Sequence, residues 1–360
     1  MARIYAYDDT AQSLFHPAAG KRSADFFEDW TPADSARMPL LAAELARLVY
    51  AAPEIVREAL PRAGLALHTW IGGDGLVARL KASGTEGFVA TDGAGHAWVV
   101  FRGTEASKPE DLLADLMTAQ TPWPGGGNVH RGFATAYGRV RDRLLAALAA
   151  TGAREISFTG HSLGAALATL AAVERGAGSR LVTFGSPRIG DTAFAAHCNG
   201  VFHTRVVGCC DLVTRVPPPD FSPAALEALL MPLYPGDGAA VATLAQAAAL
   251  VSTTLLRPLA DPRFVHVGNL AYVDRDGRTC DASDEDAIRR DQETARAEYA
   301  ARHRASTPPR SFATWFTSGS FAEFFAQSCA VLANGTVPLR DLADHAPINY
   351  VGAMARRSDG

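Results

Sequence analysis

The sequence predicts an α/β fold in which helices cover both faces of a mostly parallel central sheet. Short apolar segments alternate along the chain with longer helix-prone segments, which is the pattern of strand–helix–strand units. A Gly-His-Ser-Leu-Gly turn at 160–164 falls between an apolar run and an Ala- and Leu-rich run, as expected where a strand turns sharply into a helix. Hydrophobic residues make up 48% of the 360 residues, which is enough to fill a large core.

The first part of the chain contains an expected helix and an expected hairpin. Leucine, valine and isoleucine recur near helical spacing over 37–60, which predicts an amphipathic helix. The apolar runs 87–91 and 96–101 are separated by Asp-Gly-Ala-Gly, a turn-forming sequence. We therefore expect two strands joined as a hairpin.

The middle of the chain alternates between strand and helix. Its strands are short apolar runs, and its helices are longer runs rich in alanine and leucine. The strands are expected at 156–159, 180–184 and 201–207, and the helices at 132–150, 162–175 and 191–198. Because helices connect the strands, neighbouring strands are expected to run parallel.

The pattern changes after three consecutive prolines at 217–219. The segment 217–262 is helix-prone, and a strand is expected at 264–273. A charged helix is expected at 283–304, and 311–333 is rich in phenylalanine. The two segments 217–262 and 311–333 are predicted to be helical insertions that form an extra cap on the fold.

Ser162, in the centre of the glycine-flanked turn, is the predicted nucleophile. The turn exposes its hydroxyl at the carboxyl end of the sheet, where open α/β sheets bind ligands. The following helix begins with free N–H groups, so the Leu163 N–H is placed to stabilise a developing oxyanion. Without this strand-turn-helix context, the two glycines would indicate only a tight turn.

A serine hydroxyl needs a base, and in such sheets the acid and the histidine follow the serine in that order. Asp211 follows the strand expected at 201–207 and is the favoured acid. Asp191 is better explained as a helix N-cap, and Asp220 and Asp261 lie beside prolines in an irregular segment. These three aspartates remain weaker alternatives.

Three histidines follow Asp211 and are candidates for the base. His345 lies in a loop before the last helix, which suits a group that must approach the serine. His266 lies within an expected strand and fits a buried structural role, whereas His303 lies among arginines in the charged helix. We favour His345 over His266.

Several ordered motifs make the chain resemble the class 3 lipases, the fungal-type triacylglycerol lipase family. They are Phe-Arg-Gly-Thr at 101–104, Asp-Leu-Leu-Ala-Asp-Leu at 111–116, His-Arg-Gly-Phe at 130–133, the turn at 160–164, Thr-Phe-Gly-Ser-Pro-Arg-Ile-Gly at 183–190, Asp211 before Val-Thr-Arg-Val-Pro-Pro, Phe-Val-His-Val-Gly at 264–268, and Asp344-His345 with Tyr350. The resemblance implies an α/β-hydrolase fold and the triad Ser162, Asp211 and His345.

The resemblance also implies roles that the residues alone do not. Thr104 would be the second oxyanion-hole residue, beside Leu163, and 105–124 would form a lid. His266 and His130 would be structural. The segments 217–262 and 311–333 depart from the family pattern, so they leave the acyl-chain preference open.

The composition limits which partners and which cellular compartment we expect for the protein. The net charge is −4 with no basic stripe, so nucleic acid is not expected as a partner. The five cysteines show no metal-ligand spacing and are expected to be free thiols. The stretch 238–256 is uncharged but poor in large apolar residues, so no transmembrane anchor is expected. Because no signal peptide is evident, cytoplasmic residence is the default expectation.

The sequence therefore predicts a single α/β-hydrolase domain over 1–360 that cleaves acylglycerols or similar lipid esters, with a lipid–water interface as partner. Neither a metal nor an organic cofactor is needed by this chemistry. A phospholipase A-type enzyme and a membrane-targeting effector lipase are alternatives. From another class, the alternative is a catalytically silent lipid-binding scaffold. Oligomeric state is left open.

Overall fold

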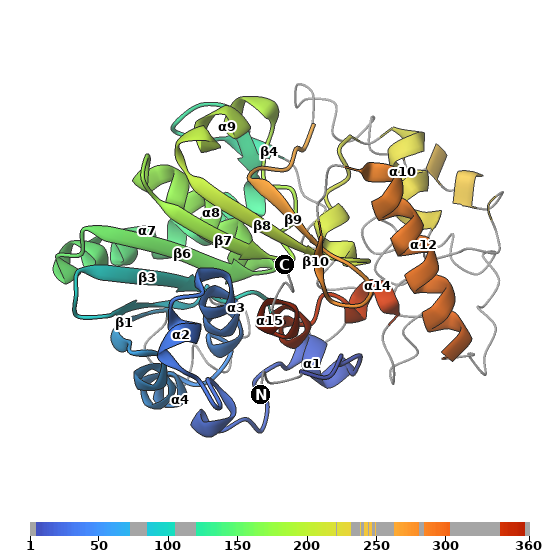
Figure 1. Ribbon diagram of the computed structural model, residues 1–360. Helices are drawn as coiled ribbons and strands as arrows, with labels where there is room; N and C mark the ends of the chain where they lie inside the picture. Colours follow the sequence, from blue (N-terminus) through green and yellow to red (C-terminus); the bar gives the residue numbers. More distant parts are fainter. Residues whose placement is uncertain are drawn as a thin grey trace.

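Eight strands of the described residues form one sheet through the middle of the molecule (Figure 1). The computed structural model describes residues 5–72, 85–104, 120–220, 222–231, 263–280, 284–302 and 339–356, and also 238, 241–243, 245–246 and 249. The strands are β1 (Ala66–Ile71), β2 (Gly87–Thr91), β3 (His96–Phe101), β6 (Glu155–His161), β7 (Arg180–Phe184), β8 (Phe202–Gly208), β9 (Asn269–Val273) and β10 (Thr279–Cys280).

The sheet is mostly parallel, as predicted. Its strand order is β1-β2-β3-β6-β7-β8-β9-β10. The five strands from β3 to β9 in this order run parallel, whereas β1, β2 and β10 pair antiparallel at the two edges. A second, two-stranded sheet joins β4 (Gln120–Pro122) to β5 (Asn128–His130). The expected hairpin at 87–101 is confirmed as β2 and β3.

Helices cover both faces of the large sheet (Figure 1). The covering helices are α7 (Arg131–Thr151) and α8 (Leu163–Arg175) on one face, and α3 (Met38–Leu48) and α15 (Pro347–Ala355) on the other. In β3, Val99 and Phe101 join the core under α8, while Trp98 and Val100 join the core under α3. This alternation follows from the two-residue period of a strand, and it accounts for the continuous apolar sequence of β3.

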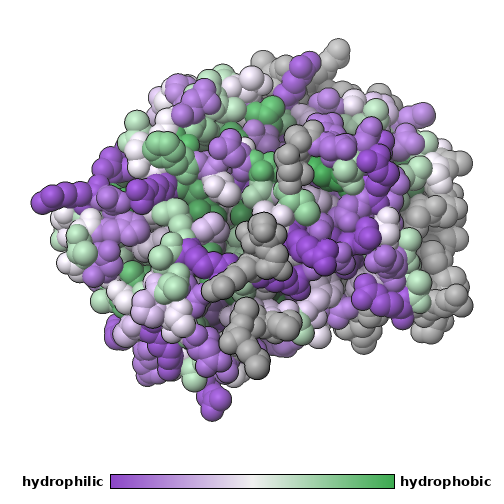
Figure 2. Space-filling view, viewed as in Figure 1, coloured by the Kyte–Doolittle hydropathy of each residue, from purple (hydrophilic) through white to green (hydrophobic). Residues whose placement is uncertain are grey.

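The other helical elements are shorter or lie outside these two layers. They are α1 (Ala11–Phe15), α2 (Pro32–Ser35), α4 (Pro53–Ala59), α9 (Thr192–His197), α10 (Pro223–Leu230), α12 (Glu285–Arg302) and α14 (Arg340–Ala343), with 3₁₀ turns η1 (Ser23–Asp25), η2 (Leu60–Ala63), η3 (Cys198–Gly200) and η4 (Leu212–Arg215). The face seen in Figure 1 is largely hydrophilic, with apolar residues in small separate patches (Figure 2). The predicted charged helix α12 fits this surface, because Ala295 and Tyr299 are its buried residues.

Several elements differ from the sequence prediction. The helix expected at 37–60 is two helices, because the chain turns over residues 49–52 and Pro53 then starts α4. The strand expected at 264–273 is reduced to β9, because Gly268 adopts a φ of 84° just before it. The edge strand β1 and the short strands β4, β5 and β10 were not predicted.

The predicted lid and insertions lie largely outside the described residues. Of the lid 105–124, only 120–124 are described, and 311–333 lies entirely outside. Within 217–262, the described part contains α10, whose first turn is capped by Ser222 Oγ accepting from Ala225 N at 3.2 Å. These segments stay predictions. In the described part of the chain, no helix is both long and apolar enough to cross a membrane, and most of 238–256 lies outside it.

Candidate active site

Ser162 lies on the turn that joins β6 to α8, as the glycine-flanked motif predicts. β6 ends at His161 and α8 begins at Leu163, so Ser162 alone connects the two elements. Its φ of 59° and ψ of −129° are conformations that L residues rarely adopt. The Ser162 N–H donates to the Phe184 carbonyl at 3.0 Å, which fixes the turn to the end of β7.

The two flanking glycines are required by close packing at this turn. A Cβ added to Gly164 would lie 2.2 Å from the Phe101 carbonyl oxygen. A Cβ added to Gly160 would lie 2.3 Å from the Gly164 carbonyl carbon. Both distances are far below van der Waals contact, so a side chain at either position would push β3, β6 and α8 apart.

Asp211 follows β8 and is held by three donors. Its Oδ1 accepts from the Val213 N–H at 2.9 Å. Its Oδ2 accepts from the Tyr350 hydroxyl at 2.5 Å and pairs with His345 Nδ1 at 2.8 Å. The Tyr350 hydroxyl in turn accepts from the Gly208 N–H at 3.0 Å. The carboxylate is therefore both satisfied and fixed in direction.

His345 lies between α14 and α15, with its ring aimed at Asp211. A carboxylate only accepts, so Nδ1 carries the proton and Nε2 of the neutral ring is left as an acceptor. His345, Asp211 and Ser162 are 2%, 1% and 2% exposed, so the whole group is shielded from water. Within the described residues, His345 Nε2 and Ser162 Oγ are both buried without a hydrogen-bond partner.

His161, next to the nucleophile, connects Ser162 to the His345 loop. The His161 ring lies 4.3 Å from the His345 ring, centre to centre, and its Nε2 donates to the His345 carbonyl at 2.7 Å. Because Nε2 carries the proton, Nδ1 accepts from the Tyr50 hydroxyl at 2.9 Å. Burial, and then the neighbouring His345, hold the pKa of His161 well below its usual value. His161 is thus a neutral residue with a fixed tautomer that links the nucleophile turn to the His345 loop.

The segment after β3 lies against the nucleophile turn. A Cβ added to Gly103 would lie 2.7 Å from the His161 carbonyl oxygen and 3.1 Å from Ser162 Cβ. Thr104 is the next residue and the last one described before 105–119. Leu163 is the first residue of α8, so its N–H is one of the free amides at the helix start. The structure therefore brings Thr104 and Leu163 to the same end of the parallel strands as Ser162.

The alternative acids and bases have other surroundings. Asp191 caps α9 by accepting from Phe194 N at 2.8 Å, as predicted. Asp220 accepts from Ser222 N at 2.9 Å. His266 is partly buried, and burial of its ring together with nearby Arg205 holds its pKa well below its usual value. The remaining two candidates, Asp261 and His303, lie outside the described residues.

Buried neutral histidines should make the protein less stable in acid. Burial lowers the pKa of His203 to about 3, and it also lowers the pKa values of His161 and His266. The unfolded chain binds these protons near pH 6.5 and the folded chain does not, so the unfolding free energy falls as pH drops below about 6.5. Each such histidine contributes a slope of about 1.4 kcal/mol per pH unit.

Urea unfolding between pH 7 and 5 measures this slope. His203→Asn should reduce this slope by the contribution of one proton, about 1.4 kcal/mol per pH unit. Stability that is constant or rising toward acid would contradict the prediction.

Comparison with known proteins finds similarity to lipases over the central part of the chain. Residues 98–221 match the family model described as lipase (class 3). A lipase of Rhizomucor miehei is 35% identical over 140 residues, which is 34% of this chain and 38% of the relative. Phospholipase A1 EG1 of Oryza sativa subsp. indica is 29% identical over 211 residues, covering 48% of this chain and 46% of the relative. The chain thus spans less than half the length of these curated relatives.

The solved structure of the R. miehei triacylglyceride lipase is also similar, with 22% identity, coverage of 67% of this chain and 79% of that one, and a TM-score of 0.45.

The default expectation of cytoplasmic residence is wrong. Relatives from Penicillium cyclopium and Fusarium solani are named secreted mono- and diacylglycerol lipases. That expectation depended only on the first residues of the sequence, and these do not report the compartment.

Proposed function

We propose that the protein is a serine hydrolase of the class 3 lipase family that cleaves lipid esters, because residues 98–221 match the model of that family. The observation that carries the proposal is the buried Asp211–His345 pair at 2.8 Å, which the His161 ring joins to the strained Ser162 turn. Ser162 is the nucleophile, His345 the base and Asp211 its orienting acid. Thr104 and Leu163 supply the oxyanion donors.

Hydrolysis proceeds in two halves. Ser162 Oγ attacks the ester carbonyl carbon while His345 Nε2 takes the hydroxyl proton, and Asp211 stabilises the imidazolium that forms. The N–H groups of Thr104 and Leu163 hold the oxyanion of the tetrahedral intermediate. His345 then protonates the leaving alcohol, and a water activated by the same ring releases the acyl group as the acid.

Acylglycerols are the proposed substrates, because the R. miehei and Penicillium relatives carry the names of a lipase and a mono- and diacylglycerol lipase. A phospholipase A activity is the second candidate, since the Oryza relative is named a phospholipase A1 and matches over a longer stretch. Both reactions use the same five residues. They differ only in the group that the site must accept around the ester.

The burial of Ser162 bears on the role of a lipid–water interface. At 2% exposure, the serine is accessible to an ester only after the residues that cover it have moved. We propose that the lid, 105–124, makes this movement at the interface. Turnover should then rise sharply when the substrate exceeds its solubility and forms droplets. A smooth saturation curve through that point would refute interfacial activation.

A substrate series measures both the substrate class and the interfacial activation. Triacylglycerols, diacylglycerols and phosphatidylcholine of matched acyl length are compared in dissolved and emulsified form. Faster release from acylglycerols supports the lipase, and faster release from phosphatidylcholine supports the phospholipase. A fluorophosphonate probe tests the remaining alternative, because it labels only an activated serine. Absence of both labelling and turnover would identify a silent lipid-binding scaffold.

A further inference from the structure

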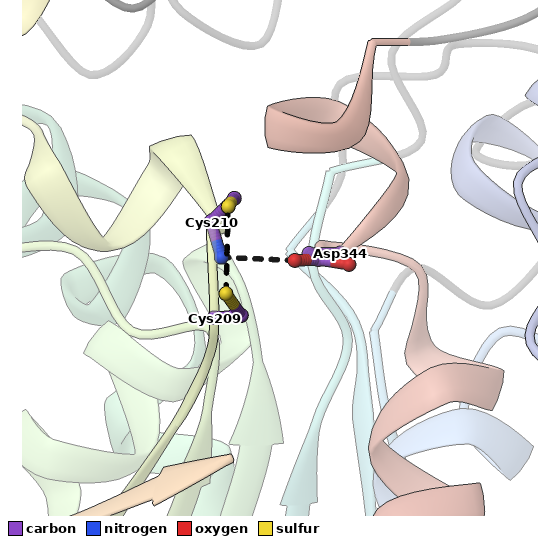
Figure 3. Close-up of side chains that lie close together, drawn as sticks. All are labelled: Cys209, Cys210 and Asp344. Carbon is purple, nitrogen blue, oxygen red and sulfur yellow. Dashed lines mark hydrogen bonds between the residues drawn. The ribbon is translucent and has the colours of Figure 1, made fainter. Parts of the chain in front are cut away.

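Two adjacent cysteines and an aspartate form a compact buried cluster beside the proposed active site (Figure 3). Cys209 and Cys210 follow β8, and their Sγ atoms lie 3.5 Å apart. The Asp344 carboxylate comes from the end of α14, and all three donor atoms lie within 4.8 Å of one another. In Figure 3 the two side chains and the carboxylate surround the Cys210 backbone nitrogen. The chain thus gathers two thiols and a carboxylate from distant segments.

The donor set fits one class of ligand. Thiolates select soft and borderline cations, and sulfur together with a carboxylate suits zinc and its heavier analogue cadmium. A fourth donor atom is close, because Asp291 Oδ2 lies 3.4 Å from Cys209 Sγ. We propose that Cys209, Cys210 and Asp344 form a binding site for a thiophilic divalent cation of the zinc and cadmium class.

The charges around the cluster allow such an ion. Asp344 is paired with Arg340 at 2.9 Å, and Asp291 is paired with Arg275 at 3.1 Å. Each carboxylate is therefore already balanced by a guanidinium. An incoming divalent cation replaces one proton on each of the two thiols and releases both protons to water. The net charge of the cluster stays the same, so neither arginine has to leave.

An entry path to the cluster is present. A surface cleft is lined by Cys209 and Asp344 together with Tyr7, Arg275, Arg340 and Tyr350. The Tyr7 hydroxyl donates to Asp344 Oδ1 at 2.8 Å at this cleft. A hydrated ion can therefore reach the Cys209 thiol and the Asp344 carboxylate without unfolding of the sheet.

We expect binding at this cluster to change the geometry of the proposed triad. This part of the inference rests on the proposed function. Cys210 directly precedes Asp211, and Asp344 directly precedes His345. The Cys210 N–H donates to Asp344 Oδ2 at 2.9 Å, which joins the two loops (Figure 3). An ion that draws Asp344 toward the thiols changes this link and displaces His345 from its working position. We expect the ion to inhibit ester hydrolysis.

Cadmium titration of the purified, reduced full chain measures binding directly, through the ultraviolet charge-transfer absorption of cadmium–thiolate bonds. The wild type should bind one ion per chain with this absorption. The double variant C209S/C210S should lose it. The matched control C198S/C280S removes one buried and one exposed cysteine elsewhere and should keep it. Loss in the control, or retention in C209S/C210S, would overturn the site.

Two further measurements keep the inference testable. If C209S/C210S does not fold, zinc X-ray absorption of the wild type should still report two sulfur neighbours, and a sulfur-free coordination sphere would overturn the site. Ester turnover is measured with and without cadmium. The coupling to the triad is supported if cadmium inhibits the wild type and a chelator reverses the inhibition. Cadmium should not slow C209S/C210S relative to the metal-free rate of that variant. A chain that binds cadmium through both thiols but cleaves no ester retains the metal site and refutes the proposed function.

Discussion

Replacing Ser162 by alanine should lower ester turnover by on the order of a millionfold, as loss of the serine does in other Ser-His-Asp hydrolases. The hydroxyl is the atom that forms the acyl-enzyme, so no neighbouring group can replace it. The fold should be unchanged, because alanine is smaller than serine and fits the same buried position without a clash. Turnover and fluorophosphonate labelling are measured together, and both should disappear.

A second buried serine provides the matched control. Ser157 lies on the same strand, β6, and its Oγ pairs with His96 Nε2 at 2.9 Å. Ser157→Ala loses a buried hydroxyl of the same kind but none of the proposed chemistry. It should remain labelled and active. Equal hydrolysis by Ser162→Ala and Ser157→Ala would remove Ser162 from the mechanism.

Replacing Asp211 by asparagine should reduce turnover about 10⁴-fold with little change in structure. Asp211 Oδ2 now accepts from His345 Nδ1 and from Tyr350. An amide in this place offers a donor to one of them, which favours the tautomer of His345 that carries its proton on Nε2. That tautomer cannot accept the Ser162 proton.

Asp191→Asn is the matched control for this charge removal. Asp191 also accepts hydrogen bonds from backbone and side-chain groups, but it caps α9, and asparagine caps helices about equally well. Its turnover should stay near the wild-type rate. The steady-state kcat and KM of both variants distinguish the two roles, and an active Asp211→Asn would exclude the proposed acid.

Elements whose residues are buried on both sides could be predicted from the sequence. β2, β3 and β7 begin and end at the predicted residues, since each is a short run of apolar residues bounded by turn formers. The nucleophile turn was equally predictable, because the positions of its glycines are determined by local crowding. In both cases the controlling interactions lie close together in the chain.

Elements determined by distant contacts could not be predicted. β1 is an edge strand whose residues are mostly part-exposed, so it lacks an apolar run. The strand expected at 264–273 is interrupted at Gly268, where a Cβ would lie 2.3 Å from His203 Nδ1. Nothing near Gly268 in the sequence reports the position of that histidine ring.

The same distinction holds within the site. The order of serine, acid and histidine along the chain was sufficient to nominate Ser162, Asp211 and His345. Their supporting contacts were missed, because Tyr50 is separated from His161 by 111 residues and Tyr350 from Asp211 by 139. His161 belongs to the nucleophile motif, so the sequence did mark it as a candidate. Its position in the sequence did not indicate that its ring binds the His345 loop.

The backbone at Ser162 also has a consequence for how such a protein evolves. A non-glycine residue held at a φ of 59° and a ψ of −129° costs of order 1–3 kcal/mol, in a molecule whose whole stability is typically about 5–15 kcal/mol. Glycine would relieve this cost, so the most stable chain of this fold is one that has lost its nucleophile. A laboratory selection for heat resistance alone should therefore favour inactive descendants, and only a simultaneous demand for turnover retains the serine.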